Sequence, residues 1–188
     1  MKYKSTFHRA SLFLLLFHVI AEPAFSQKKF TVRKSEMAFT SNADLELITA
    51  SSDKVQGLID PSSNQFAFSV DVKSFEGFNS ALQREHFNEK YMESEKFPKV
   101  RFSGKIIEPI DFSSDNSYEV RAKGDLDIHG QKQTRIIKSK VRVENGIIYL
   151  ETRFFVPLAD HNISIPTIVS QKIATEIEVE FKATMSMQ

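Results

Sequence analysis

Apolar and polar residues alternate along most of the chain from Phe30 onward. Residues 65–73 show the pattern most clearly, because every second side chain there is large and apolar: Phe66, Phe68, Val70 and Val72. The same two-residue period recurs in residues 118–128 and 175–183. A period of two is typical of β-strands with one buried face, so the sequence predicts eight or nine strands.

Short polar turns separate these strands. Asp60-Pro61-Ser62 has a turn sequence, because proline fixes its own φ, and Glu144-Asn145-Gly146 predicts a hairpin. No βαβ rhythm, internal repeat or linker stands out, so we expect one mainly all-β domain. Closure into an eight-stranded antiparallel barrel removes the unpaired strand edges and is the predicted fold. A filled β-sandwich is the alternative.

One segment, around residues 80–95, breaks the alternation and predicts a helix. Phe87 and Tyr91 lie four residues apart and would share one helix face. Phe97-Pro98 ends the segment, because proline disfavours the α conformation in the residue before it. A helix that delivers aromatic side chains just before a strand suggests a plug over the barrel.

The N-terminus has the order of features found in secretory signals. Basic residues at positions 2, 4 and 9 precede an apolar run over residues 11–20, which is too short to span a bilayer comfortably. Small residues at Ala24 and Ser26 match a cleavage site, so we predict a signal peptide over residues 1–26. No later run has transmembrane length, and a periplasmic or secreted protein is expected.

Composition and charge exclude several classes of function. The chain has a formal net charge of +1, and loss of the predicted signal, with three cations and Glu22, brings it near −1. Without a basic surplus, nucleic acid is a poor candidate partner. The absence of cysteine removes thiol catalysis, thiolate metal sites and disulfides, so the core alone must hold the fold.

Residues with the potential for catalysis form no recognisable constellation. His86, His129 and His161 lack the spacing of metal ligands, and neither a nucleophile elbow nor a phosphate loop occurs. Asp125 and Asp127 fall on the charged face of a predicted strand, where a solvated role is expected. We predict neither a cofactor, a metal nor a catalytic site. His129 is the one residue to check for acid–base chemistry inside a barrel.

Aromatic residues are the remaining anomaly, with 17 Phe and no Trp. The order of motifs along the chain resembles that of the YceI-like family of periplasmic, lipocalin-like barrels over residues 28–184. The matching elements are His86-Phe87, Tyr91-Met92, Phe97-Pro98, Phe102 and Gly124-Asp125-Leu126-Asp127-Ile128-His129-Gly130. The resemblance implies an extended eight-stranded barrel around a long apolar pocket, associated with polyisoprenoid or other long-chain lipids and with no established enzymatic activity.

Under this hypothesis the barrel binds a polyisoprenoid or fatty-acid-like lipid, as a monomer or a homodimer. The expected apolar lining is Phe66, Phe68, Phe87, Tyr91, Phe97, Phe102, Leu126 and Ile128. Arg84 and His86 are candidates for contacts with a polar head group, or else lie on an exposed helix face. Two alternatives stay open: a filled barrel that acts through its surface as an accessory protein in envelope stress or respiration, and a lipid hydrolase or isomerase that uses His129.

Overall fold

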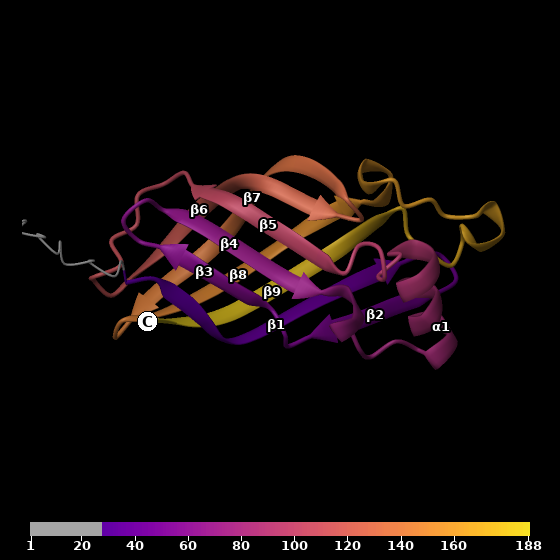
Figure 1. Cartoon of the computed structure of the whole chain (residues 1–188), viewed down its shortest axis with the longest axis horizontal. Helices are drawn as coiled ribbons and strands as arrows, with labels where there is room; N and C mark the ends of the chain where they lie inside the picture. Colours follow the sequence, from indigo (N-terminus) through magenta and orange to yellow (C-terminus); the bar gives the residue numbers. More distant parts are fainter. Residues whose placement is uncertain (1–27) are drawn as a thin grey trace, which may run out of the picture.

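Nine β-strands form one antiparallel sheet in the computed structural model, which describes residues 28–188 (Figure 1). The predicted signal peptide lies outside the described residues. The strands are β1 (Phe30–Asn42), β2 (Leu47–Ser52), β3 (Gln56–Asp60), β4 (Gln65–Asp71), β5 (Lys99–Ile106), β6 (Asn116–Ile128), β7 (Gln131–Glu144), β8 (Ile147–Pro157) and β9 (Glu176–Met187).

The sheet closes because β1 uses both of its edges. One edge pairs with β9, from Phe30 opposite Met187 to Thr40 opposite Glu178. The other edge pairs with β3 near its start and with β2 along its second half. The strands β1 and β3 to β9 therefore form a closed eight-stranded antiparallel barrel, and the predicted fold is confirmed.

Two tight hairpins share one backbone conformation. Asn145 and Gly146 join β7 to β8 with φ values of 51° and 74°, as the sequence predicted for a hairpin. His129 and Gly130 join β6 to β7 in the same way, with φ values of 52° and 71°. Positive φ at both central residues is typical of the type I′ turn, whose twist matches that of the strands. The turn thus places a histidine at the end of the barrel.

The predicted helical segment is shorter than expected and irregular. The α-helix α1 (Ala81–His86) begins at Ser80, whose Oγ accepts a hydrogen bond from Gln83 N. It continues as the π-helical turn η2 (Phe87–Tyr91), in which Met92 N donates to Phe87 O at 2.9 Å. Short 3₁₀ turns complete the helical elements of residues 28–188: η1 (Val72–Ser74), η3 (Leu158–His161) and η4 (Thr167–Val169). No helix in this part of the chain is long and apolar enough to cross a membrane.

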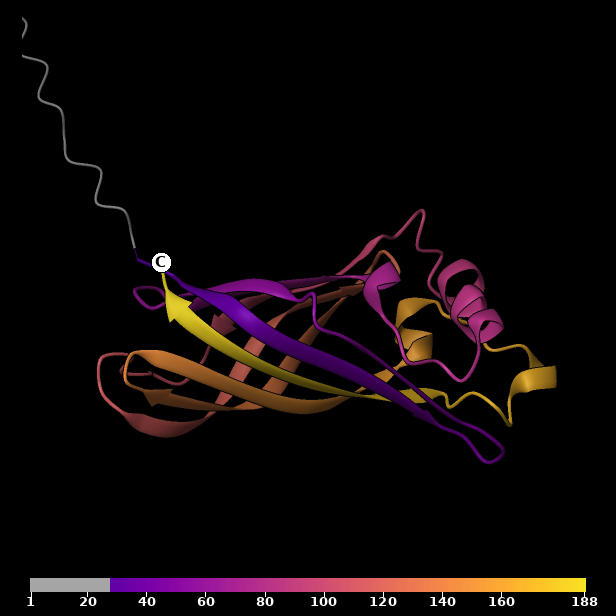
Figure 2. The ribbon, with the colours of Figure 1, turned by 90° about the horizontal axis from the view of Figure 1, so that it is seen from below.

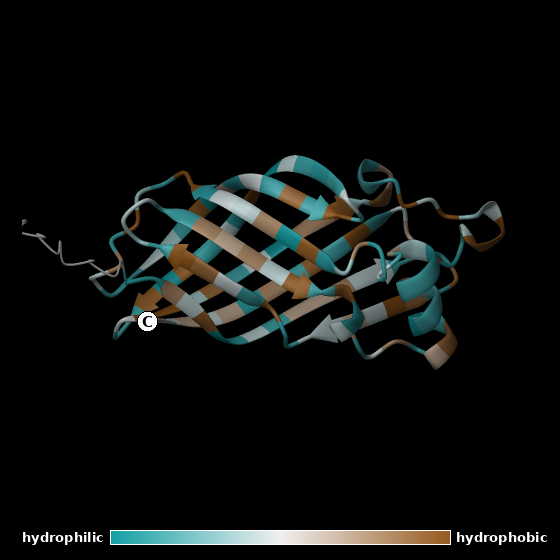
Figure 3. Ribbon diagram, viewed as in Figure 1, coloured by the Kyte–Doolittle hydropathy of each residue, from teal (hydrophilic) through white to brown (hydrophobic). Residues whose placement is uncertain are grey.

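The two ends of the barrel differ (Figure 2). The packed end carries the C-terminus and the turns between β3 and β4 and between β7 and β8. The capped end carries α1, η2, the hairpin of β1 and β2, the turn between β6 and β7, and the loop of residues 158–175 between β8 and β9. Along the strands between them, apolar and polar bands alternate (Figure 3). This alternation places one apolar face inside the closed barrel.

Candidate functional site

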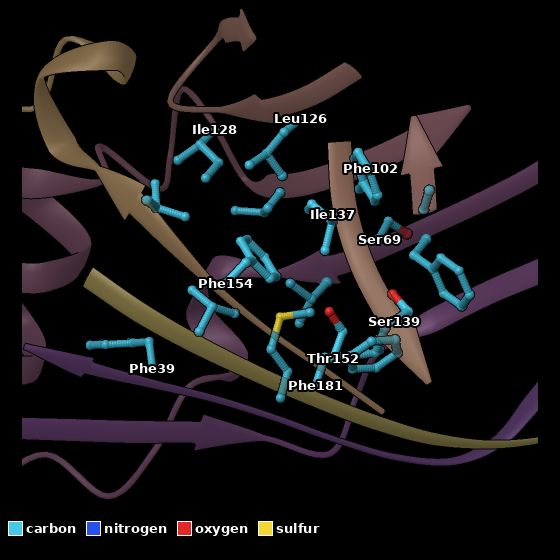
Figure 4. Close-up of a pocket in the computed structure, with 18 of the residues that line it drawn as sticks. Phe39, Ser69, Phe102, Leu126, Ile128, Ile137, Ser139, Thr152, Phe154 and Phe181 are labelled. Atoms are coloured by element: carbon cyan, nitrogen blue, oxygen red, sulfur yellow. The ribbon is translucent and has the colours of Figure 1, made fainter. Parts of the chain in front are cut away.

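An apolar cavity of about 180 Å³ lies inside the barrel, with lining residues from all eight barrel strands (Figure 4). Nearly all of the lining is aliphatic or aromatic, and the polar exceptions among the described residues are Ser69, Ser139 and Thr152. Thr152 Oγ1 donates to the carbonyl of Lys138 at 2.8 Å, so its hydrogen-bonding capacity is used by the wall. The cavity therefore suits an apolar occupant better than a charged one.

Small residues occupy neighbouring positions on β5 and β6. Gly104 on β5 lies opposite Gly124 on β6, and an added Cβ on Gly104 would come within 2.1 Å of the Lys123 carbonyl oxygen. The two strands therefore approach too closely at this point for a side chain, as at a tight barrel bend. Ala122, two residues before Gly124 on the same face of β6, lines the cavity. Its small side chain leaves space that a larger residue would fill.

Six of the residues predicted to form an apolar lining do line this cavity: Phe66, Phe68, Phe87, Phe102, Leu126 and Ile128. Contact of these residues with a ligand stays a prediction.

Two other predicted lining residues lie outside the cavity wall. The ring of Phe97 packs edge-on against His129, with centroids 4.7 Å apart, and covers Gly130. Tyr91 lines the adjoining pocket nearer the surface, where burial raises the pKa of its phenol. The π-helical turn explains its position, because the wider turn takes Tyr91 off the face that Phe87 presents to the cavity.

Several aromatic lining residues were missed. Phe39 and Phe75 pack around Phe87, and Phe154 and Phe181 come from β8 and β9. The alternation of β8 and β9 would have identified the last two. The position of Phe39 in the cavity wall could be found only from the fold, because closure of β1 against its neighbours is what brings Phe39 to the helical segment.

A second pocket, of about 340 Å³, opens at the capped end and forms the mouth of the cavity. Phe39 and Phe87 stack between the two spaces, with centroids 5.2 Å apart and an interplanar angle of 19°. The residues that line both spaces are Phe39, Phe87, Met92, Leu158, Ile163 and Ile177. A ligand that enters from the mouth must therefore pass this aromatic pair.

The two candidates for head-group contacts lie on different sides of α1. His86 lines the mouth pocket. Arg84 faces a polar surface groove instead, where its Nη2 donates to Lys73 O at 3.1 Å and lies 3.9 Å from the Glu76 carboxylate. Of the two, His86 is the better placed to meet the polar end of an occupant.

We call α1, η2 and the following residues 92–97 the cap. The cap is fastened to the barrel at its C-terminal end. Glu93 has a φ of 42°, which ends the helical turn and directs its carboxylate to His129 Nε2 at 2.6 Å. His129 Nδ1 lies 3.1 Å from the carbonyl oxygen of His161 and must donate in that bond, since a carbonyl only accepts.

The pair of Glu93 and His129 meets one condition for acid–base chemistry, a histidine within reach of a carboxylate. The second condition is access to the cavity, and neither residue is among those that line it. Within residues 28–188, no group of three or more His, Cys, Asp or Glu side chains is placed to hold a metal ion. The geometry assigns the pair to fastening the cap.

His161 is fully buried beside this pair. Its Nδ1 donates to the carbonyl of Gln131 at 3.1 Å, and its Nε2 has no hydrogen-bond partner among the described residues. Burial lowers the pKa of the imidazole, and the nearby Arg135 guanidinium adds to this effect. The carbonyls of Gln131 and Ile128 and the Asp160 carboxylate oppose it, without reversing the direction. The neutral form of His161 is therefore favoured in the folded protein.

The structure defines a class, a closed eight-stranded barrel with a capped apolar cavity. Residues 21–185 match the family model described as the YceI-like domain. The chain therefore belongs to the YceI-like family. It matches none of the curated proteins with which its sequence was compared.

Solved structures with a similar fold come from several bacteria. A polyisoprenoid binding domain from Saccharophagus degradans is 16% identical, with a TM-score of 0.71, over 86% of this chain and 99% of that one. Burkholderia cenocepacia BcnA is 17% identical, with a TM-score of 0.65, over 80% and 95%. The Campylobacter jejuni YCEI protein is 15% identical, with a TM-score of 0.56, over 74% and 84%. At these identities the similarity shows a shared fold.

Proposed function

We propose that this protein binds a long apolar lipid, a polyisoprenoid or a fatty-acid-like chain, inside the barrel and carries it in the periplasm or outside the cell. The observation that carries the proposal is the cavity, whose wall is almost entirely aliphatic and aromatic. The protein acts by binding rather than by catalysis. The signal-peptide pattern of residues 1–26 supports the location.

The energetics favour an apolar chain as the occupant. Burial of each CH₂ group contributes about 0.8 kcal/mol before entropic costs, so affinity does not require polar contacts. Apolar cavities of about 150 Å³ in other proteins stay dry and bind small apolar molecules. A longer chain would fill the cavity, pass Phe39 and Phe87, and leave its polar end near His86 in the mouth pocket.

The comparisons support this choice of ligand class. One solved structure of similar fold is described as a polyisoprenoid binding domain. That description concerns another protein with 16% sequence identity, so the particular lipid has to be identified for this chain itself.

The experiment is to purify the secreted protein under native conditions and analyse bound molecules by native mass spectrometry and solvent extraction. We expect a co-purifying lipid, or binding of added polyprenols or fatty acids to protein stripped of lipid. Absence of both would contradict the proposal.

A pair of matched variants ties binding to the cavity. Ala122→Phe fills the cavity from β6 and should lower affinity about tenfold or more, because the added ring takes the place of several methylene groups of the ligand. Ala67→Phe adds the same ring to the exposed outer face of β4 and should leave affinity unchanged. Equal affinities in the two variants would place the ligand elsewhere.

A further inference from the structure

Large apolar side chains are exposed around the mouth of the cavity. Among residues 28–188, eight large apolar side chains are exposed. Four of them belong to segments at the capped end: Leu45, Leu47, Leu82 and Ile168. Ile168 is 91% exposed and Leu45 is 67% exposed. Single exposed apolar residues are ordinary, but a group around one opening indicates a contact surface.

Hydrogen bonds join the segments that carry these residues. Leu45 N, at the tip of the β1–β2 hairpin, donates to Gln171 O in the loop of residues 158–175 at 2.9 Å. Gln83 Nε2 on α1 donates to Glu46 Oε1 of the same hairpin tip at 2.9 Å. The hairpin tip, α1 and η4 project together from one end of the barrel (Figure 2). Because hydrogen bonds join the segments that carry them, we call the hairpin tip, α1 and η4 together the rim.

The loop of residues 158–175 is unusually apolar for a long surface loop. Ile163 is buried and anchors it to the barrel, while Ile168 stands in the 3₁₀ turn η4 at its far end. Connections of more than about 12–15 residues are uncommon in compact domains and are usually either functional or disordered linkers, and this one is anchored. An anchored base with an exposed apolar tip fits a loop that inserts into another apolar phase.

We propose that this rim, Leu45, Leu47, Leu82 and Ile168, docks on the surface of a lipid bilayer and that the ligand passes between membrane and cavity there. The inference rests on the proposed function. Its main support is continuity, because Leu82 of the rim also lines the mouth pocket that leads past Phe87 to the cavity. A long-chain lipid is poorly soluble in water, so direct contact of the mouth with the membrane shortens its exposure to water.

Charges on the segments of the rim decide which bilayer it fits. Acidic side chains outnumber basic ones on the hairpin tip, α1, η2 and the loop of residues 158–175, with Asp44, Glu46, Glu85, Glu89 and Asp160 against Arg84, Lys90 and Lys172. Attraction to anionic lipids therefore contributes little, and insertion of apolar side chains must drive docking. The rim should bind zwitterionic phosphatidylcholine vesicles, with weak dependence on salt and with no gain from added anionic lipid.

A tryptophan substitution tests the contact directly, because the natural chain has no tryptophan. In Ile168→Trp, the single indole should shift its emission to the blue on addition of phosphatidylcholine vesicles and should be quenched by brominated lipids. The control is Ile136→Trp, at a 56% exposed position on the outer face of β7, which should show neither change. Unchanged emission of the Ile168→Trp protein would overturn the proposal.

Transfer kinetics then separate docking from ligand binding. Ile168→Asp should slow the transfer of a fluorescent fatty acid from phosphatidylcholine vesicles about tenfold, while its affinity for the same probe added without vesicles stays unchanged. Ile136→Asp should leave both quantities unchanged.

Normal transfer by Ile168→Asp would overturn the docking surface and leave the proposed function intact. Vesicle insertion of Ile168→Trp in a protein that binds no lipid probe would support docking and contradict the proposed function.

Discussion

The two ends of this barrel are built from the same strands and the same alternation, yet large side chains fill one end and the cavity between them opens at the other. At the packed end, Phe30, Ile148 and Met185 are completely buried, and Phe112 from the β5–β6 connection packs on Phe30 with centroids 5.5 Å apart. Beyond this layer, inward-facing residues of the same strands surround the cavity, which extends from Ile59 and Ile106 near the packed end to Met92 and Ile163 at the capped end. Period-two patterning therefore does not decide whether a barrel interior is filled.

What differs is how each end is closed. The packed end is closed by large side chains that meet across the barrel. The capped end is closed by α1 and η2, neither of which contains a buried residue. The cap is held by the stacking of Phe39 on Phe87, by the buried side chain of Met92 and by polar contacts such as that of Glu93 with His129. An element with little buried apolar area opens at a lower free energy than the core, so the capped end is the natural entrance.

The largest expected difference between the ends is in stability. Phe30→Ala should reduce the free energy of unfolding by about 3–5 kcal/mol, because it leaves a hole in a close-packed region. Phe154→Ala, which enlarges a cavity that already exists, should cost less than about 2 kcal/mol. Urea denaturation of lipid-free protein measures both values. Similar losses for the two variants would mean that the region around the cavity is as tightly packed as the other end.

The next effect concerns entry of the ligand at the capped end. Phe87→Asp places a carboxylate between the cavity and its mouth and should weaken lipid binding about 10–100-fold. Tyr91→Asp changes only the mouth pocket and should weaken lipid binding less than about threefold. Titration with a fluorescent fatty acid gives the affinities, and circular dichroism checks that both variants keep the barrel. Equal effects would mean that the ligand does not pass Phe87.

The smallest expected effect is a dependence of stability on pH that originates at the capped end. Burial holds the pKa of His161 below its ordinary value of 6.5, so the unfolded chain binds a proton more readily than the folded protein. Protonation of His161 in the unfolded chain should therefore lower the free energy of unfolding as the pH falls below about 6.5. The loss continues until the pH reaches the pKa of His161 in the folded protein.

His161→Asn provides the control, because its amide nitrogen can still donate to the carbonyl of Gln131 but does not titrate. Urea denaturation between about pH 7.5 and pH 5.5 should show a shallower loss of stability in this variant than in the natural protein. Parallel pH profiles of the two proteins would rule out His161 as a source of the acid sensitivity.

Much of the cavity lining follows from local patterns. Phe66, Phe68 and Phe102 lie on strands with clear alternation, and closure of the barrel directs one face of every strand inward. Tyr91 and Phe97 could not be placed in this way. The position of Tyr91 depends on the π-helical turn, and that of Phe97 depends on the close approach of Gly130, a residue distant in the sequence.

The sequence by itself determined the antiparallel strands, the tight turn at Asn145-Gly146 and the helical interruption before β5. These follow from local preferences and from a two-residue period that depends only on neighbouring positions. Only the tertiary structure decided where the interior is filled, which side of α1 Arg84 and His86 face, and how Glu93, His129 and His161 come together to fasten the cap. Packing volume and contacts between distant segments arise when the sheet closes, so they cannot be read from the residues one segment at a time.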